Sequence, residues 1–243
     1  MGEIWTLSSK SYRDAIGLLQ RAGSTVAIAV LILAASGFIS IGVDRLINTM
    51  LGRQVAGTLL NIVGIWFAAP YLVSLYRLLL NNQTVPPETL RNTQATRRFF
   101  AWSAVLAFIT AAPGYFFAAV MPPGLASITP ENAELTYLVW PTFFMLIAVW
   151  IFAIRTITLV PAAAVDADAG IAAAVQQTRG RFWFVVGAVT VPLLPVMLLG
   201  MLLTLNTGGI LSIVFSIGMA LAVLILAVTV SANLYRWLLD NPK

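Results

Sequence analysis

The chain contains no cysteine and no histidine. Without cysteine it can form no disulfide, no thiolate nucleophile and no cysteine metal cluster. Without histidine it lacks the commonest metal ligand, the side chain that titrates near neutral pH and the usual axial ligand of haem. These absences exclude thiol redox chemistry and most catalytic centres, and we expect neither a catalytic residue nor a metal or other cofactor.

Charge is the second scarce property. Charged residues make up 9% of the 243 residues, apolar residues make up 60%, and the mean hydropathy is +0.91. A soluble globular domain carries about a quarter charged residues. A surface with so little charge suits lipid rather than water, so we expect an all-α polytopic membrane protein that forms a single integral membrane domain over residues 1–243.

Long apolar runs are what the sequence has instead. A bilayer core about 30 Å thick needs about 20 apolar residues for each helical crossing. The runs are continuous and do not alternate with polar residues, which favours helices over the strands of a barrel. Six transmembrane helices are predicted, at residues 24–43, 55–80, 99–121, 137–154, 182–205 and 210–230.

The arginines and lysines predict the orientation, because positive residues are retained on the cytoplasmic side of a membrane. With the N-terminus inside, twelve of the 14 basic residues lie on the cytoplasmic side, and only Arg45 and Arg53 lie outside. We therefore expect both termini in the cytoplasm. The basic residues are scattered at membrane boundaries and form no continuous stripe, which argues against nucleic acid as a partner.

Three cytoplasmic segments are predicted to form amphipathic helices. Residues 8–21 mix apolar and charged side chains and are expected to lie on the inner membrane surface. Residues 86–97 begin with two prolines and a glutamate. Residues 166–179 carry Asp166 and Asp168 in the first turn and Arg179 at the end, a charge order that suits the helix dipole.

A weak internal repeat connects these segments. The pattern L-Y-R-x-L-L-x-N occurs at residues 75–82 and again at 234–241, and arginine-aromatic clusters open the third and fifth predicted spans. We infer three copies of one unit, a cytoplasmic helix followed by a transmembrane hairpin, at 8–82, 86–155 and 166–241. Such copies keep one orientation and are related by an axis along the membrane normal, so they are parallel hairpin repeats.

One segment resembles a known family. Leu159, Pro161-Ala162, Asp166, the run Ala172 to Ala174, and Thr178-Arg179-Gly180-Arg181-Phe182-Trp183 are similar to the bacterial six-span glycerophosphoryl diester phosphodiesterase membrane domain and to its stand-alone relatives of YciC type. Where that domain is fused to a phosphodiesterase, catalysis belongs to the soluble part. That part uses histidines, and this chain has none. The resemblance therefore implies a fold and carries over no catalytic residue.

The candidate site is a basic cluster at the starts of the third and fifth predicted spans. It consists of Arg97, Arg98, Arg179 and Arg181. Near an anionic leaflet each such charge contributes about 1 kcal/mol to the attraction of lipid headgroups. The cluster is therefore a candidate contact for anionic lipid or for an acidic partner, and the alternative is that it only fixes the topology.

We expect a non-enzymatic accessory, scaffold or assembly subunit of the bacterial inner membrane, with membrane lipids and other integral membrane proteins as partners. The alternative is a transporter or channel for a small molecule or a lipid, which a membrane cavity lined by Asn61 and Thr110 would favour. Apart from Asp44, Arg45 and Arg77 near boundaries, no ionisable residue lies in a predicted span, which argues against proton coupling. An intramembrane enzyme would need a convergent polar cluster that the sequence does not predict.

Single cysteines introduced at Ser127 and Asn92 test the orientation, because the chain has no other thiol. We expect Ser127→Cys to react with a membrane-impermeant maleimide in intact cells, and Asn92→Cys to react only in inverted vesicles. Labelling of both positions from the same side would contradict the predicted topology.

Overall fold

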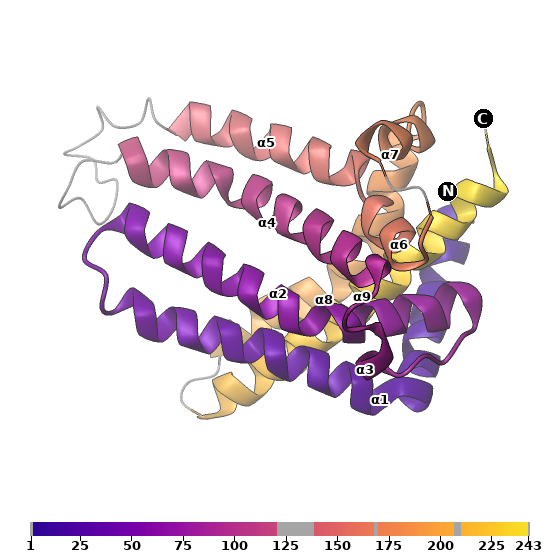
Figure 1. Cartoon of the computed structure of the whole chain (residues 1–243). Coiled ribbons are helices and arrows are strands. Elements are labelled where there is room, and N and C mark those ends of the chain that lie inside the picture. Colours follow the sequence, from indigo (N-terminus) through magenta and orange to yellow (C-terminus); the bar gives the residue numbers. More distant parts are fainter. Residues whose placement is uncertain (1, 121–138, 168–169, 207–209, 243) are drawn as a thin grey trace.

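The computed structural model describes residues 2–120, 139–167, 170–206 and 210–242, which are helical and contain no strand (Figure 1). The helices are α1 (Gly2–Asp44), α2 (Met50–Asn81), α3 (Pro87–Leu90), α4 (Gln94–Val120), α5 (Val139–Arg155), α6 (Leu159–Ala164), α7 (Ile171–Gln177), α8 (Phe182–Asn206) and α9 (Ile210–Asp240). The expected all-α class is confirmed for this part of the chain.

Five of these helices, namely α1, α2, α4, α8 and α9, are long and apolar enough to cross a membrane. The helix at the fourth predicted span, α5, has 17 residues. At about 1.5 Å per residue it is about 26 Å long, slightly less than a bilayer core of about 30 Å. The helices are those of a multi-pass membrane protein.

Helix α1 combines the first predicted surface helix and the first predicted span. A kink at Ala22, where φ is −138° and ψ is 30°, separates the two parts. The first part already begins at Gly2, and its side chains Leu7, Ser11 and Leu18 are buried. This part therefore packs on the protein with one face, in addition to any contact that it makes with the membrane surface.

The other two predicted surface helices are shorter than expected. Within 86–97 only the four residues of α3 form a separate helix, because α4 already begins at Gln94. The helix expected over 166–179 is reduced to α7, whose N-cap is Gly170. Pro87 stands at the first position of α3, where proline is favoured, and a turn at residues 91–93 separates this helix from α4.

The dipole role predicted for Asp166 is wrong. Asp166 precedes α7 in a left-handed conformation with φ of 58°, and it forms an ion pair of 2.6 Å with Arg77 of α2. Asp166 therefore lies outside α7, which begins at Ile171, and its carboxylate pairs with another helix instead. Asp168 lies outside the described residues.

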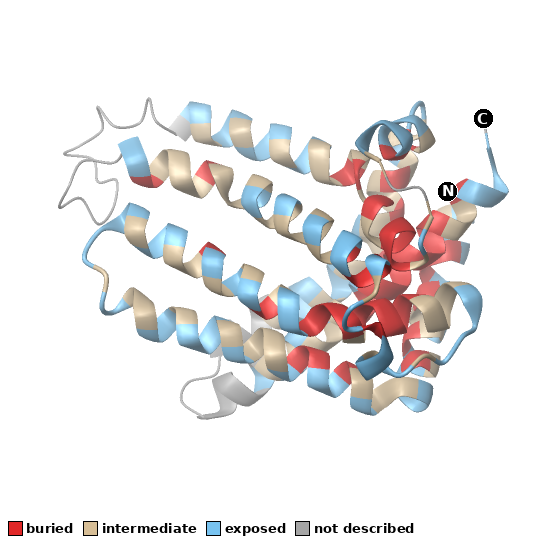
Figure 2. Ribbon diagram, viewed as in Figure 1, coloured by how far each residue is buried: buried red, intermediate tan, exposed pale blue. Residues whose placement is uncertain are grey.

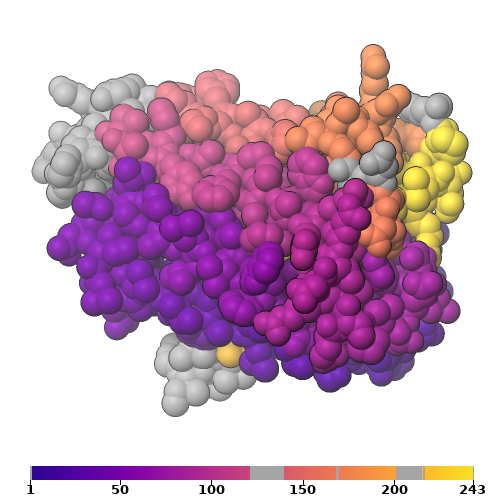
Figure 3. Space-filling view, in the orientation of Figure 1, coloured from indigo at the N-terminus to yellow at the C-terminus, as the bar shows by residue number. Residues whose placement is uncertain are grey.

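The long helices form three antiparallel hairpins, α1–α2, α4–α5 and α8–α9, and both ends of the chain lie at the same end of the molecule with α3, α6 and α7 (Figure 1). We call this end the base. Buried residues gather at the base, whereas the far halves of the hairpins are mostly exposed (Figure 2). In Figure 3, the visible face is formed largely by α1, α2 and α4, and the yellow end of α9 emerges only at the edge.

Small residues allow α1 and α2 to approach closely. A Cβ atom added at Gly64 of α2 would lie 2.7 Å from the Cβ of Ser36 in α1, and one added at Gly57 would lie 3.1 Å from Oγ of Ser40. The serine pair of α1 therefore packs on glycines, as membrane helix pairs often do. No such approach occurs at Gly218 of α9, where no described atom lies within 4 Å of an added Cβ.

This difference predicts opposite effects of the same substitution. Replacing a helical glycine with alanine normally stabilises a helix by about 1 kcal/mol. We expect that stabilisation for Gly218→Ala, whereas Gly64→Ala should cost about 1–3 kcal/mol, because the methyl group collides with Ser36. The thermal unfolding midpoint in detergent, followed by tryptophan fluorescence, should fall for the second variant only. Equal or higher stability of Gly64→Ala would contradict the close contact.

Candidate functional site

Three arginines bind the carbonyl groups at the ends of other base segments. Nε of Arg77 in α2 donates to the carbonyl of Ala164, the last residue of α6, at 3.0 Å. Nη1 of Arg155 in α5 donates to the carbonyl of Thr178, the C-cap residue of α7, at 3.0 Å. Both arginines therefore stabilise the C-terminal end of a short helix whose carbonyls would otherwise lack a donor.

The third arginine acts on a long helix. Nη2 of Arg236 in α9 donates to the carbonyls of Leu79 and Leu80 at the end of α2, at 2.8 Å and 2.7 Å. A helix C-terminus carries a partial negative charge that favours a nearby cation. Arg77, Arg155 and Arg236 are thus engaged in holding the base together.

The segment that resembles a known family contributes to the same packing. Leu159, Ala163 and Ala164 of α6 are buried in the base. The hydroxyl of Thr178 is also buried and lies 3.3 Å from the carbonyl of Arg155. Among the described residues, this segment therefore packs and forms hydrogen bonds within the base.

Two of the predicted site residues, Arg179 and Arg181, line one pocket of about 660 Å³ between the end of α7 and the C-terminal end of α9. The guanidinium of Arg181 lies 5.1 Å from the ring centroid of Trp237 and donates to the carbonyl of Asn241. Arg179 is exposed beside Gly180, which has a left-handed φ of 70°. In this pair Arg181 already has partners in α9, so Arg179 is the more accessible charge.

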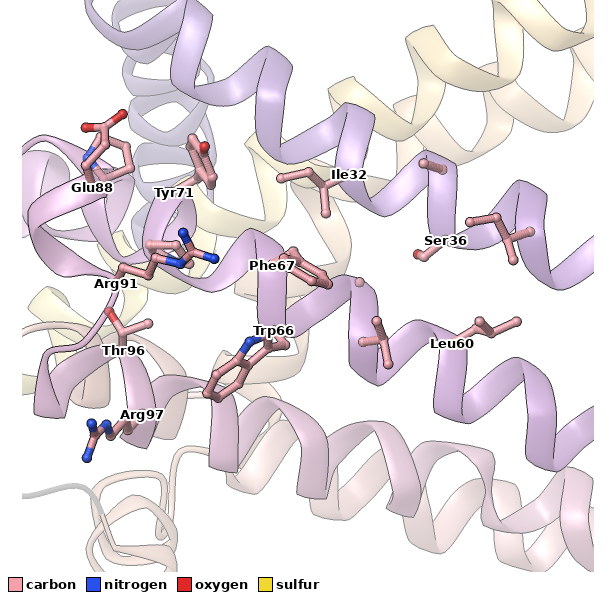
Figure 4. A pocket seen from close by; sticks show the side chains of 16 residues that line it. Ile32, Ser36, Leu60, Trp66, Phe67, Tyr71, Glu88, Arg91, Thr96 and Arg97 are labelled. Atoms are coloured by element: carbon pink, nitrogen blue, oxygen red, sulfur yellow. The ribbon is translucent and has the colours of Figure 1, made fainter.

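A second pocket is a groove of about 570 Å³ along α1 and α2, which we call the α1–α2 groove (Figure 4). Its long part is apolar, because Ile32 of α1 and Leu60, Val63 and Phe67 of α2 line it. Trp66 forms part of the wall and meets Phe100 of α4 edge to face, with ring centroids 4.7 Å apart.

The end of the α1–α2 groove nearest the base is polar. Glu88, Arg91, Thr96 and Arg97 line it, and Figure 4 shows both guanidinium groups on the side away from Ile32 and Leu60. The turn between α3 and α4 holds these residues, since the hydroxyl of Thr96 donates to the carbonyl of Leu90 at 2.7 Å. The groove therefore joins an apolar trough to two positive charges and one negative charge.

The four predicted arginines are divided between different surfaces. Arg97 lines the α1–α2 groove, whereas Arg179 and Arg181 line the pocket beside α9, and Arg98 is exposed and lines neither of the two. Arg91 was not among the predicted site residues, although it joins Arg97 in the groove. A local pattern gives no signal for this pairing, because it depends on the turn after α3.

A third pocket lies among α1, α2 and α4 in the halves of these helices far from the base, and we call it the outer crevice. It has a volume of about 450 Å³ and a largely polar lining that includes Asn61, Thr110, Gln54, Asp44 and Arg53. Asn61 and Thr110 thus line one crevice, the arrangement that would favour the transport alternative. The sequence places Asp44 at a membrane boundary and Arg53 on the outer side, and it gives no signal that both line one crevice.

Among the described residues, no group of three or more acidic side chains is arranged to hold a metal ion. Comparison of the chain with family models, with curated proteins and with solved structures finds no match. The resemblance to the six-span membrane domain therefore stays a prediction, and a function for this chain has to be argued from the groove, the crevice and the base.

Proposed function

We propose that the protein is a non-enzymatic accessory subunit of the bacterial inner membrane, which holds an anionic phospholipid in the α1–α2 groove and packs against other membrane proteins. The observation that carries this proposal is the shape of the groove, in which Arg91 and Arg97 lie at one end of an apolar trough. A phospholipid has the same division, with a phosphate next to acyl chains.

The charges account for selectivity. Guanidinium groups bind phosphate oxygens through several N–H donors, and two of them next to one carboxylate leave a net positive charge at the headgroup position. An acyl chain gains little from entering the trough, because the surrounding lipid is equally apolar. Discrimination between lipids therefore depends on Arg91 and Arg97. The trough only provides a surface that an acyl chain can follow.

The proposed topology has six spans, of which α5 is the fourth along the chain, with the base and both termini in the cytoplasm. A locally thinned bilayer or polar residues at its ends would accommodate the 17 residues of α5. The base contains most of the basic residues, as the cytoplasmic side requires. The proposed three-fold repeat is supported by Arg77, Arg155 and Arg236, each of which lies near the end of the second helix of a hairpin and binds a carbonyl at another helix end.

The exposed faces of the hairpins support the accessory role. On α5, Trp140 is 61% exposed and Phe144 is 62% exposed, and Met197 of α8 is 64% exposed. Large apolar side chains that are exposed on long apolar helices require lipid or another membrane helix as a neighbour. A scaffold that assembles within the bilayer plane would use such faces.

The lipid contact is tested by the double variant Arg91→Gln/Arg97→Gln. The matched control is Arg13→Gln/Arg98→Gln, which removes the same charge from exposed positions outside the groove. At about 1 kcal/mol for each charge, we expect roughly tenfold or greater loss of phosphatidylglycerol affinity for the groove variant, and a smaller loss for the control. Native mass spectrometry in detergent with added phosphatidylglycerol measures both. Equal lipid retention by the two variants would rule out the groove as the headgroup site.

Transport is the second candidate function, and the outer crevice favours it, because Asn61 and Thr110 both line it. Reconstitution in liposomes separates the candidates. Solute flux by the purified protein, with no stoichiometric partner after gentle solubilisation, would support transport, whereas co-purification of a partner without flux would support the accessory role.

A further inference from the structure

We propose that the outer crevice binds a small zwitterion, with a primary ammonium group at Asp44 and an anionic group at Arg53. This site lies in the crevice that the transport candidate would use. Binding there does not require that the ligand cross the membrane. It does not depend on the lipid proposed for the α1–α2 groove, because Ser36 is the one described residue that lines both pockets.

Three hydroxyl groups of the crevice donate within their own helices and can accept further hydrogen bonds. Ser36 donates to the carbonyl of Leu33 at 2.7 Å, and Thr58 donates to the carbonyl of Gln54 at 2.9 Å. The hydroxyl of Thr110 likewise donates to a carbonyl of its own helix, at 2.8 Å. Since each hydroxyl has one proton, only the oxygen lone pairs remain for a ligand. At these three hydroxyls a ligand can therefore bond only as a donor, whereas the amides of Gln54 and Asn61 in the lining also offer N–H groups.

Asp44 also favours a donor on the ligand. Its Oδ1 atom is buried and has no hydrogen-bond partner in the described part of the chain. A buried carboxylate oxygen without a donor is destabilising. Asp44 is also the last residue of α1, where the helix dipole adds partial negative charge. A primary ammonium group, with three donors and a positive charge, satisfies the carboxylate.

Arg53 supplies the opposite charge. It does not pair with Asp44, since the described residues contain no ion pair within 4.0 Å other than Arg77–Asp166. Its Nε donates to the carbonyl of Ile47 at 2.8 Å, which fixes the guanidinium next to the crevice. Arg53 also lies in the first turn of α2, where the dipole favours an anion. One carboxylate beside an arginine is a poor site for a metal ion, but it matches a ligand with both charges.

Two sources share this chemistry, a free amino acid and the ethanolamine phosphate headgroup of phosphatidylethanolamine. Isothermal titration of the full chain in dodecyl maltoside, with L-alanine and O-phosphoethanolamine as probes, tests the site. We expect at least one probe to bind, and Asp44→Asn and Arg53→Gln each to weaken that binding tenfold or more. The matched control is Asp240→Asn, which removes an exposed carboxylate at the base and should leave the affinity unchanged.

O-Phosphocholine tests the donor requirement directly, because its ammonium group carries no N–H. We expect it to bind at least tenfold more weakly than O-phosphoethanolamine. Equal affinity, or equal effects of Asp44→Asn and Asp240→Asn, would overturn the proposal.

Nanodiscs with and without phosphatidylethanolamine identify the source. Weaker probe binding in the presence of that lipid indicates the headgroup, and unchanged binding indicates a free solute; both outcomes support the zwitterion site. Failure of both probes to bind in detergent and in lipid-defined nanodiscs would overturn it. Flux into liposomes is measured separately, so binding without flux refutes transport and leaves the site intact.

Discussion

The hydrogen bonds of three arginines to helix ends hold the base together, and the rest of the structure depends on this base. Apolar helices in a bilayer gain little by leaving lipid for one another, so close packing and polar contacts have to hold them. Arg77, Arg155 and Arg236 each donate to backbone carbonyls at the end of another segment. Further polar contacts join distant helices, such as the 2.8 Å hydrogen bond between Tyr76 and Ser231.

The base leaves the far halves of the hairpins less constrained. There, contact is made by small residues, as between Ser36 and Gly64, and most large side chains face outwards. The α1–α2 groove and the outer crevice both extend into this half, so each has a wall of packed helices and an open side. The tightly packed base and the open far halves are thus two different environments within one fold.

Residues of one chemical type have different tasks in this frame. Arg77 and Arg236 are engaged by carbonyls, and Arg181 is engaged by Trp237 and the end of α9. Arg91 and Arg97 instead line a groove at the end of an apolar trough. The positive-inside pattern predicts one role for all of these arginines, because it counts charge without regard to partners. Only the contacts separate the structural arginines from those available to a ligand.

By itself, the sequence determined the all-helical class, the positions of the long apolar helices and the break near Ala22, because hydropathy and helix length are local properties. The tertiary structure decided the rest. Arg77 meets Asp166 across 89 positions of sequence, and the helix predicted for residues 166–179 begins only at Ile171. The α1–α2 groove and the outer crevice likewise combine side chains from different helices. A local pattern cannot encode such contacts, since they depend on the path of the chain through the base.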